Sequence, residues 1–254
     1  MPYLARMTIH LGHVRDVVRY PVKSMAGVPA ESAFLGWHGL AGDRRFAFRR
    51  LGDDSGFPWL TAGRLAQLLL YRPLGVEESS GEPLPTHVRT PGGVDVELRG
   101  DALRDEIAGR FGSGVELMKI KHGIFDDASV SVISLATIAG IGAEAGVELD
   151  RRRFRANVFV ETLDPAPFLE DGWVGGRLLF GESEPRPAVS VTLRDVRCAM
   201  LNLDPDTAVQ DARVLKAVVR MNENNAGVYG TVVQTGTIRV GDAVYLERSP
   251  APAT

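Results

Sequence analysis

Short runs of apolar residues, separated by glycine, proline and polar residues, dominate the hydrophobic pattern of this chain. Alternating or continuous apolar segments of this length are typical of β-strands. They predict strands at 14–18, 46–49, 115–120, 157–160, 173–180 and 188–196, with two more between 229 and 246. Because strands outnumber helical segments, the pattern predicts a β-rich α+β fold, a barrel or sandwich with short helices at its ends.

Apolar residues fall at helical spacing in only a few short segments. The stretches 61–71 and 209–219 have this spacing, and Asp101 is expected to cap a third helix that Gly112 ends. The segment 129–146 indicates a buried strand that runs into a helix capped by Ser134.

Two features divide the chain. Residues 75–93 are rich in Gly, Ser, Pro and Glu without periodicity, which predicts a loop and the best candidate for disorder. A boundary near Gly114, before the strand at 115–120, predicts an N-terminal domain over 1–114 and a second domain over 115–254.

Composition and charge exclude some classes of function. The net charge of −3 over 254 residues provides no general attraction to nucleic acid or to an anionic membrane. No apolar run reaches the ~18 residues that a membrane span needs, and residues 1–18 do not resemble a signal peptide. With one cysteine in the whole chain, we expect a cytoplasmic protein.

That cysteine, Cys198, is the main candidate for chemistry. It is an inert buried thiol, a nucleophile, or one metal ligand whose companions come from elsewhere. Arg197 precedes it at the end of a predicted strand, where a thiol can ionise. The five histidines show no zinc spacing, and a cysteine-protease site would need His38 or His122 to lie beside the thiol.

Three basic segments are candidate anion sites. Lys23 and Ser24 follow a proline turn, and Arg44 lies in a second turn after Gly42 and Asp43. Arg155 and Asn157 would share one side of a strand by its two-residue period. Cations and amides in such positions suit a phosphate or a heterocycle edge, although each segment alone is as typical of a solvated surface.

The same motifs, taken in order, carry a family resemblance. They read Tyr-Pro-Val-Lys-Ser-x-x-Gly, Gly-Leu-x-Gly-Asp-Arg-Arg-Phe, Arg-Arg-Phe-Arg-x-Asn, Arg-Cys-x-x-x-x-x-Asp-Pro-Asp-Thr and Gly-x-Ile-x-Val-Gly-Asp-x-Val, and they run from Tyr20 to Tyr245. This series resembles the MOSC family with its N-terminal β-barrel domain. That family includes the C-terminal module of molybdenum cofactor sulfurases, and the mitochondrial amidoxime-reducing component with its bacterial relatives.

The resemblance implies a MOSC-type β-barrel domain, a smaller N-terminal β-barrel domain and a molybdenum cofactor, molybdopterin with its metal, held between them. Cys198 would ligate molybdenum and Arg197 would support the thiolate. The residues implied to hold the pterin and its phosphate are Lys23, Ser24, Arg44, Ser134, Arg155, Asn157 and Arg197.

The implied activity is reduction of N-hydroxylated substrates, such as amidoximes or hydroxylamines, by oxygen transfer to molybdenum. One cysteine cannot hold an iron–sulfur cluster, so electrons would come from a separate flavin or iron–sulfur protein. No membrane anchor is expected. Two alternatives stay open: a cofactor or persulfide carrier that uses Cys198, and a metal-free lyase on the same scaffold. Ala208, where many relatives have Gly, leaves substrate specificity open.

Overall fold

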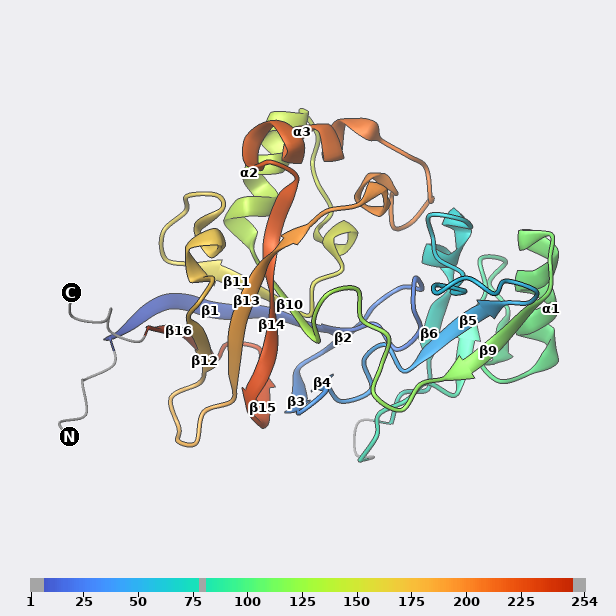
Figure 1. The fold of residues 1–254 in the computed structure, drawn as a ribbon, viewed down its shortest axis with the longest axis horizontal. Coiled ribbons are helices and arrows are strands. Elements are labelled where there is room, and N and C mark those ends of the chain that lie inside the picture. The colour runs from blue at the N-terminus through green and yellow to red at the C-terminus, as the bar shows by residue number, and fades with distance from the viewer. Residues whose placement is uncertain (1–6, 78–80, 249–254) are drawn as a thin grey trace.

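The computed structural model describes residues 7–77 and 81–248, and its largest unit is a closed β-barrel (Figure 1). Seven strands form it: β1 (Met7–Arg19), β10 (Val130–Ser134), β11 (Val158–Thr162), β12 (Arg177–Phe180), β13 (Ala188–Val196), β14 (Asn225–Gln234) and β16 (Ala243–Arg248). The sheet order is β11-β10-β14-β13-β12-β16-β1, and pairing of β1 with β11 closes it. The predicted β-rich barrel is confirmed.

Side chains fill the interior of this barrel. Val14, Val132, Val158, Val189 and Val228 all belong to one buried cluster, and each comes from a different strand. Branched side chains of this kind pack well on the inner face of a pleated sheet. The barrel is therefore a packed core, and any ligand site must lie at its ends or against a neighbouring unit.

Short helices and edge strands surround the barrel. Helices α2 (Leu135–Ala145) and α3 (Ala212–Asn222) pack together over one end, with the 3-10 turns η2 (Arg151–Phe154), η3 (Leu169–Trp173) and η4 (Ala199–Asn202) nearby. Strand β2 (Val28–Ala30) pairs with the end of β1. A separate small sheet contains β3 (Ser32–Gly36), β4 (Gly39–Leu40) and β15 (Gly236–Arg239).

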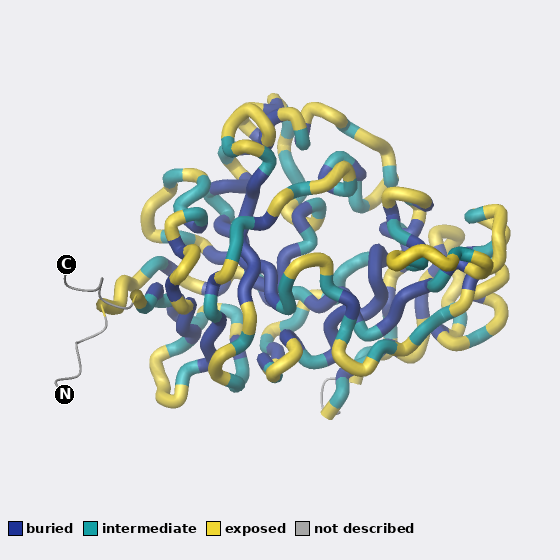
Figure 2. The backbone as a smooth tube through the Cα atoms, in the orientation of Figure 1, coloured by how far each residue is buried: buried dark blue, intermediate teal, exposed yellow. Residues whose placement is uncertain are grey.

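A second, smaller unit has its own core beside the barrel, at the right of Figure 1. Its elements are β5 (Phe46–Arg50), η1 (Ala66–Leu70), β6 (Arg72–Leu74), β7 (His87–Arg89), β8 (Asp95–Glu97), α1 (Asp101–Phe111) and β9 (Val115–Lys119). Phe46, Phe48, Tyr71 and Leu103 are among its fully buried side chains. Figure 2 shows buried backbone concentrated separately in each unit, with exposed loops around both.

The chain crosses between these two units more than once. Strand β1 lies in the barrel although it precedes the smaller unit, and β9 pairs antiparallel with β5 although it follows residue 114. The two hydrophobic cores are thus interleaved along the sequence. The division into 1–114 and 115–254 stays a prediction about independent domains.

Several local expectations change in the structure. The helix expected over 61–71 is only the 3-10 turn η1, and Gly100 rather than Asp101 occupies the cap position before α1. Gly112 does end α1, at a φ of 77°. The expected loop at 75–93 contains β7, and its residues 78–80 lie outside the described part. No helix within 7–77 and 81–248 is long and apolar enough to cross a membrane.

Candidate functional site

Cys198 lies just beyond the end of β13, where it caps the short turn η4. Its thiol is free and exposed. It contributes to a cavity of about 450 Å³, which we call the Cys198 cavity, whose lining residues come from both units. That volume falls within the range of small-molecule sites. The expected position of the thiol at a strand end is confirmed, and a buried filler role does not fit an exposed thiol.

The Cys198 cavity brings together predicted residues that are far apart in sequence. Its lining includes Lys23, Ser24, Arg44, Arg155 and Arg197, together with Cys198. Of the predicted cofactor contacts, Asn157 and Ser134 do not line it.

The turn that carries Lys23 and Ser24 is held by the neighbouring unit. The backbone N–H of Lys23 donates to the carbonyl of Phe46 over 2.8 Å, and Ser24 has a left-handed φ of 68°. The Ser24 side chain is buried, yet its hydroxyl has no hydrogen-bond partner in the described part of the chain. An unpartnered hydroxyl in a cavity wall is available to a ligand.

Lys23 has an acidic partner that the sequence analysis did not identify. Its Nζ lies 2.7 Å from Oδ1 of Asp126, in the loop before β10. Burial alone would raise the pKa of Asp126, but the charge and hydrogen bond of Lys23 hold it below its usual value. An ammonium paired with a partly exposed carboxylate can exchange that partner for another anion.

Arg44 is fixed by a network behind the cavity wall. Its guanidinium pairs with Asp43 and donates to the carbonyl of Arg155 over 3.2 Å. Asn157 completes the network, because its amide donates to Asp43 over 3.1 Å and to the carbonyl of Val18 over 3.2 Å. Burial alone would lower the pKa of Arg44, but Asp43 raises it, so Arg44 stays charged. Asn157 therefore positions Arg44 from behind.

Arg155 differs from its predicted conformation. The expected strand with Arg155 and Asn157 on one face is wrong, because Arg155 follows the turn η2 with a φ of 53° and β11 starts only at Val158. Its guanidinium stacks 4.4 Å from the ring centroid of Tyr20 and donates to the carbonyl of Met25 over 2.7 Å. Burial lowers the pKa of Arg155 to about 10.

Arg197 is held by a buried carboxylate. It pairs with Asp195 and donates to the carbonyl of Phe154, and its side chain is about 10% exposed. Burial raises the pKa of Asp195 to about 6, while Arg197 and a 3.2 Å bond from the Ser131 hydroxyl oppose the shift. Tyr229 also lines the cavity, and its pKa is raised by burial and by Asp195.

Ser134 does not line the Cys198 cavity, and its hydroxyl is bonded within the protein. It caps α2 as expected, since its hydroxyl accepts from the backbone N–H of Thr137 over 3.1 Å. The same hydroxyl donates to the buried carboxylate of Glu170 over 3.0 Å. Ser134 is fully buried in this cluster and does not line the Cys198 cavity, so its contact with a cofactor stays a prediction.

Sequence reasoning missed four residues of this site: Asp126, Arg153, Asp195 and Tyr229. Asp195 could have been found, because it lies two residues before Arg197 at the end of the same strand and such positions share a face. Arg153 lies within the Arg-Arg-Phe-Arg-x-Asn motif, next to the segment already singled out for Arg155. Asp126 and Tyr229 come from other segments, and no local pattern indicates them.

The donors of this cavity fit an anionic ligand with a soft metal. Five basic residues line it against three acidic ones, and two of the basic residues, Arg44 and Arg153, also pair with Asp43 and Asp204 outside the lining. Nε of Arg153 and Nε of Arg197 are buried without a partner. No three His, Cys, Asp or Glu side chains in the described ranges form a metal group, so Cys198 would need companions from the ligand itself.

Comparison with known proteins agrees with these features. The MOSC domain model matches residues 119–245. Mitochondrial amidoxime-reducing component 1 of Homo sapiens is 24% identical over 95% of this chain and 85% of its own length. Mitochondrial amidoxime reducing component 2 of Rattus norvegicus is 24% identical over 96% of this chain and 86% of its own.

Among solved structures, the YUAD protein from Bacillus subtilis superposes with a TM-score of 0.52 at 15% identity, over 96% of this chain and all of that chain. This likeness concerns the fold alone. The family model covers half of the sequence and includes the strand end that carries Cys198. The chain belongs to the MOSC domain family.

Proposed function

We propose that the protein binds a molybdenum cofactor in the Cys198 cavity and reduces N-hydroxylated substrates with electrons from a separate protein. The observation that supports this most is the convergence of an exposed thiol with Lys23, Ser24, Arg155 and Arg197 in one cavity. Relatives named as amidoxime-reducing components over most of the chain point to the same oxidoreductase class.

Different residues would bind the metal and the phosphate of the cofactor. Cys198 would supply a soft thiolate to the metal, and the dithiolene of the pterin would supply two more sulfurs. Lys23, Arg155 and Arg197 would neutralise the cofactor's phosphate, with the Ser24 hydroxyl as a further donor. Arg44, fixed by Asp43 and Asn157, would keep this arrangement rigid.

The bound cofactor would supply two-electron oxygen-transfer chemistry. In the overall reaction, R–NH–OH takes up two electrons and two protons and gives R–NH₂ and water. Since the chain has one cysteine, it cannot bind an iron–sulfur cluster through thiolates, and a flavin or iron–sulfur protein would deliver the electrons. The exposure of Cys198 leaves the metal position open to a substrate.

Metal analysis of protein made in a cofactor-competent host tests this proposal. We expect close to stoichiometric molybdenum in the wild type, and reduction of benzamidoxime with reduced methyl viologen as donor. Cys198→Ala should lose most of the metal and at least a hundredfold in activity, whereas Met200→Leu, which removes the other sulfur that lines the cavity, should retain both. Equal molybdenum in wild type and Cys198→Ala would contradict the proposed ligand.

The free, exposed thiol also suits a second function, that of a sulfur carrier. A carrier would hold persulfide sulfur on Cys198 and would show no turnover with the chemical donor. Mass spectrometry of the freshly isolated protein would then detect one added sulfur atom on the peptide that contains Cys198. Persulfide without reductase activity would select the carrier.

A further inference from the structure

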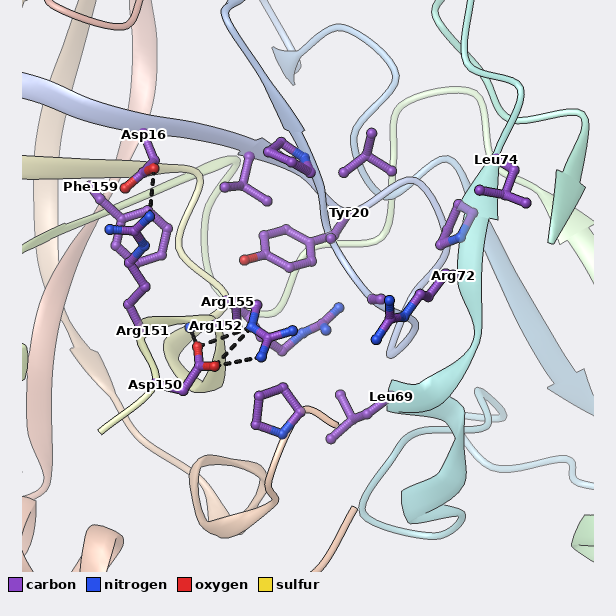
Figure 3. Close-up of a pocket in the computed structure, with 17 residues that line it drawn as sticks. Asp16, Tyr20, Leu69, Arg72, Leu74, Asp150, Arg151, Arg152, Arg155 and Phe159 are labelled. Carbon is purple, nitrogen blue, oxygen red and sulfur yellow. Dashed lines mark hydrogen bonds and ion pairs between the residues drawn. The ribbon is translucent and has the colours of Figure 1, made fainter. Parts of the chain in front are cut away.

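A second cavity, of about 610 Å³, is also lined by Arg155 (Figure 3). We call it the Tyr20 cavity. Strands β1, β2 and β6 and the segment 150–155 contribute its walls, and Arg155 is the one residue that lines both this cavity and the Cys198 cavity. None of the roles assigned above uses its space.

One wall of the Tyr20 cavity is apolar. Val18, Val28, Leu74 and Phe159 line it from β1, β2, β6 and β11, and Leu69 adds a further apolar side chain. Such a wall favours an organic body over a small hydrated ion, because binding there removes apolar surface from water.

Tyr20 gives this cavity an unused polar group. The residue is 2% exposed, and its hydroxyl has no hydrogen-bond partner within residues 7–77 and 81–248. In Figure 3 the phenol points into the cavity, between Phe159 and the arginines of the 150–155 segment. Burial raises the pKa of Tyr20 to about 12, so the hydroxyl is a neutral donor at physiological pH. An unpartnered hydroxyl on a residue that lines a cavity is available to a ligand or to water.

The charges around the cavity leave one cation without a carboxylate. Three of its four arginines are paired, Arg151 with Asp16, Arg152 with Asp150 and Asp206, and Arg72 with Asp206. Arg155 forms no ion pair in the described part of the chain. Four guanidinium groups against three carboxylates leave a single positive charge, which lies beside the ring of Tyr20.

We propose that the Tyr20 cavity binds an amphipathic organic monoanion, a carboxylate carried on an aromatic or aliphatic body. The carboxylate would accept hydrogen bonds from the Tyr20 hydroxyl and from the Arg155 guanidinium, and the body would lie along Val28, Leu74 and Phe159. The Tyr20 hydroxyl and the apolar wall lie outside the Cys198 cavity, so this site is additional to the proposed function. The two sites share Arg155, whose guanidinium lines both cavities.

Calorimetric titration of the intact protein tests the ligand class. Naphthalene-2-carboxylate is the probe, naphthalene-2-carboxamide its neutral counterpart of the same shape, and inorganic phosphate the compact anion. We expect the carboxylate to bind at least tenfold more tightly than the amide, and phosphate not to displace it. Equal affinity of carboxylate and amide would overturn the proposal, as would displacement by phosphate.

Variants locate the probe. Tyr20→Phe removes only the unpartnered hydroxyl and should weaken carboxylate binding by roughly three- to tenfold. Amide binding should weaken less, because the amide carbonyl is a neutral acceptor. Tyr245→Phe removes a phenol hydroxyl from β16, away from the cavity, and should not change either affinity. If Tyr20→Phe has no effect and Lys23→Ala abolishes binding, the probe occupies the Cys198 cavity and the inference fails. Molybdenum content is measured on the same samples, so this outcome is separate from failure of the proposed function.

Discussion

Lys23 illustrates how a single pair of residues can decide whether the cavity accepts an anion. Its ammonium lies in the wall of the Cys198 cavity, where it already forms an ion pair with Asp126 over 2.7 Å. Any phosphate that reaches Lys23 therefore competes with a carboxylate for the ammonium. The Asp126 side chain is 59% exposed to solvent. Because an exposed ion pair contributes little to stability, breaking the Lys23–Asp126 pair costs little free energy.

Removing that competition should strengthen anion binding. We predict that Asp126→Asn raises the affinity of the metal-free protein for pyrophosphate by roughly three- to tenfold at low salt, because Lys23 loses its partner. Asp127→Asn is the matched control, since Asp127 lines the same cavity and is not paired with Lys23. Titration calorimetry measures both. An equal gain in the two variants would mean that only the general field of the cavity matters.

Asp195 should give the stability of the protein a recognisable pH dependence. Its folded-state pKa of about 6 is raised above the value of the unfolded chain, so the folded state binds the proton more tightly. For a carboxyl shifted in this direction, stability increases as the pH falls through the folded pKa. Relative to Asp195→Asn, the wild type should gain about 1 kcal/mol of unfolding free energy between pH 7 and pH 5.

Urea denaturation of wild type and Asp195→Asn at several pH values checks this result. Because the comparison is a difference, carboxylates common to both proteins cancel. The difference in unfolding free energy between the two proteins could instead be independent of pH, or change in the opposite direction. Either result would show that the charge of Arg197 fully offsets the effect of burial on the pKa of Asp195.

At the residue scale, sequence reasoning identified the cations and the thiol but only one of their acidic partners. Lys23, Arg44 and Arg197 were recognised by type and motif, whereas the partner of Lys23 lies 103 residues away along the chain. Asp43 was recognised as a neighbour of Arg44, and that pair is present. Long-range pairs depend on how the barrel closes, which no local pattern encodes.

At the scale of elements, the turn η2 shows why a correct motif can carry a wrong geometry. Arg155 and Asn157 alternate as strand residues would, but the Asp150 side chain accepts from the N–H of Arg152 and starts a 3-10 turn. Arg155 then adopts a left-handed conformation that directs its guanidinium onto Tyr20. The local hydrogen bond overrides the two-residue period.

The start of α2 provides an element-scale prediction. Ser134→Ala removes the helix cap and one partner of the buried Glu170, so we predict a loss of about 1–3 kcal/mol in unfolding free energy. Pyrophosphate affinity should stay unchanged, because Ser134 does not line the cavity. Ser190→Ala, in β13, is the control and should change stability by less than about 0.5 kcal/mol. Weaker pyrophosphate binding by Ser134→Ala at normal stability would restore its predicted role in cofactor binding.

At the scale of the whole molecule, the cavity exists because the chain passes between its two units. Lys23 and Arg44 come from the crossing after β1, and Asp126 from the return after β9. Alternating apolar patterns predicted a β-rich fold because each strand buries one face. They could not predict that β1 closes the barrel with β11, since pairing across some 140 residues leaves no local signal.

This crossing leads to a prediction about the division at residue 114. A fragment of residues 115–254 would lack β1, so the edges of β11 and β16 would stay unpaired and the barrel could not close. A fragment of residues 1–114 would lack β9, the partner of β5. We therefore predict that neither fragment folds cooperatively alone.

Separate expression, followed by thermal unfolding and amide NMR, measures this directly. The control is co-expression of the two fragments, which restores every strand partner and should recover a cooperative transition, because only one peptide bond is missing. Independent folding of residues 115–254 would show that strands β10 to β16 close without β1, and that the predicted domain boundary is also a folding boundary. Failure of both fragments alone, with recovery together, would instead mean that the Cys198 cavity and the barrel form in one folding event.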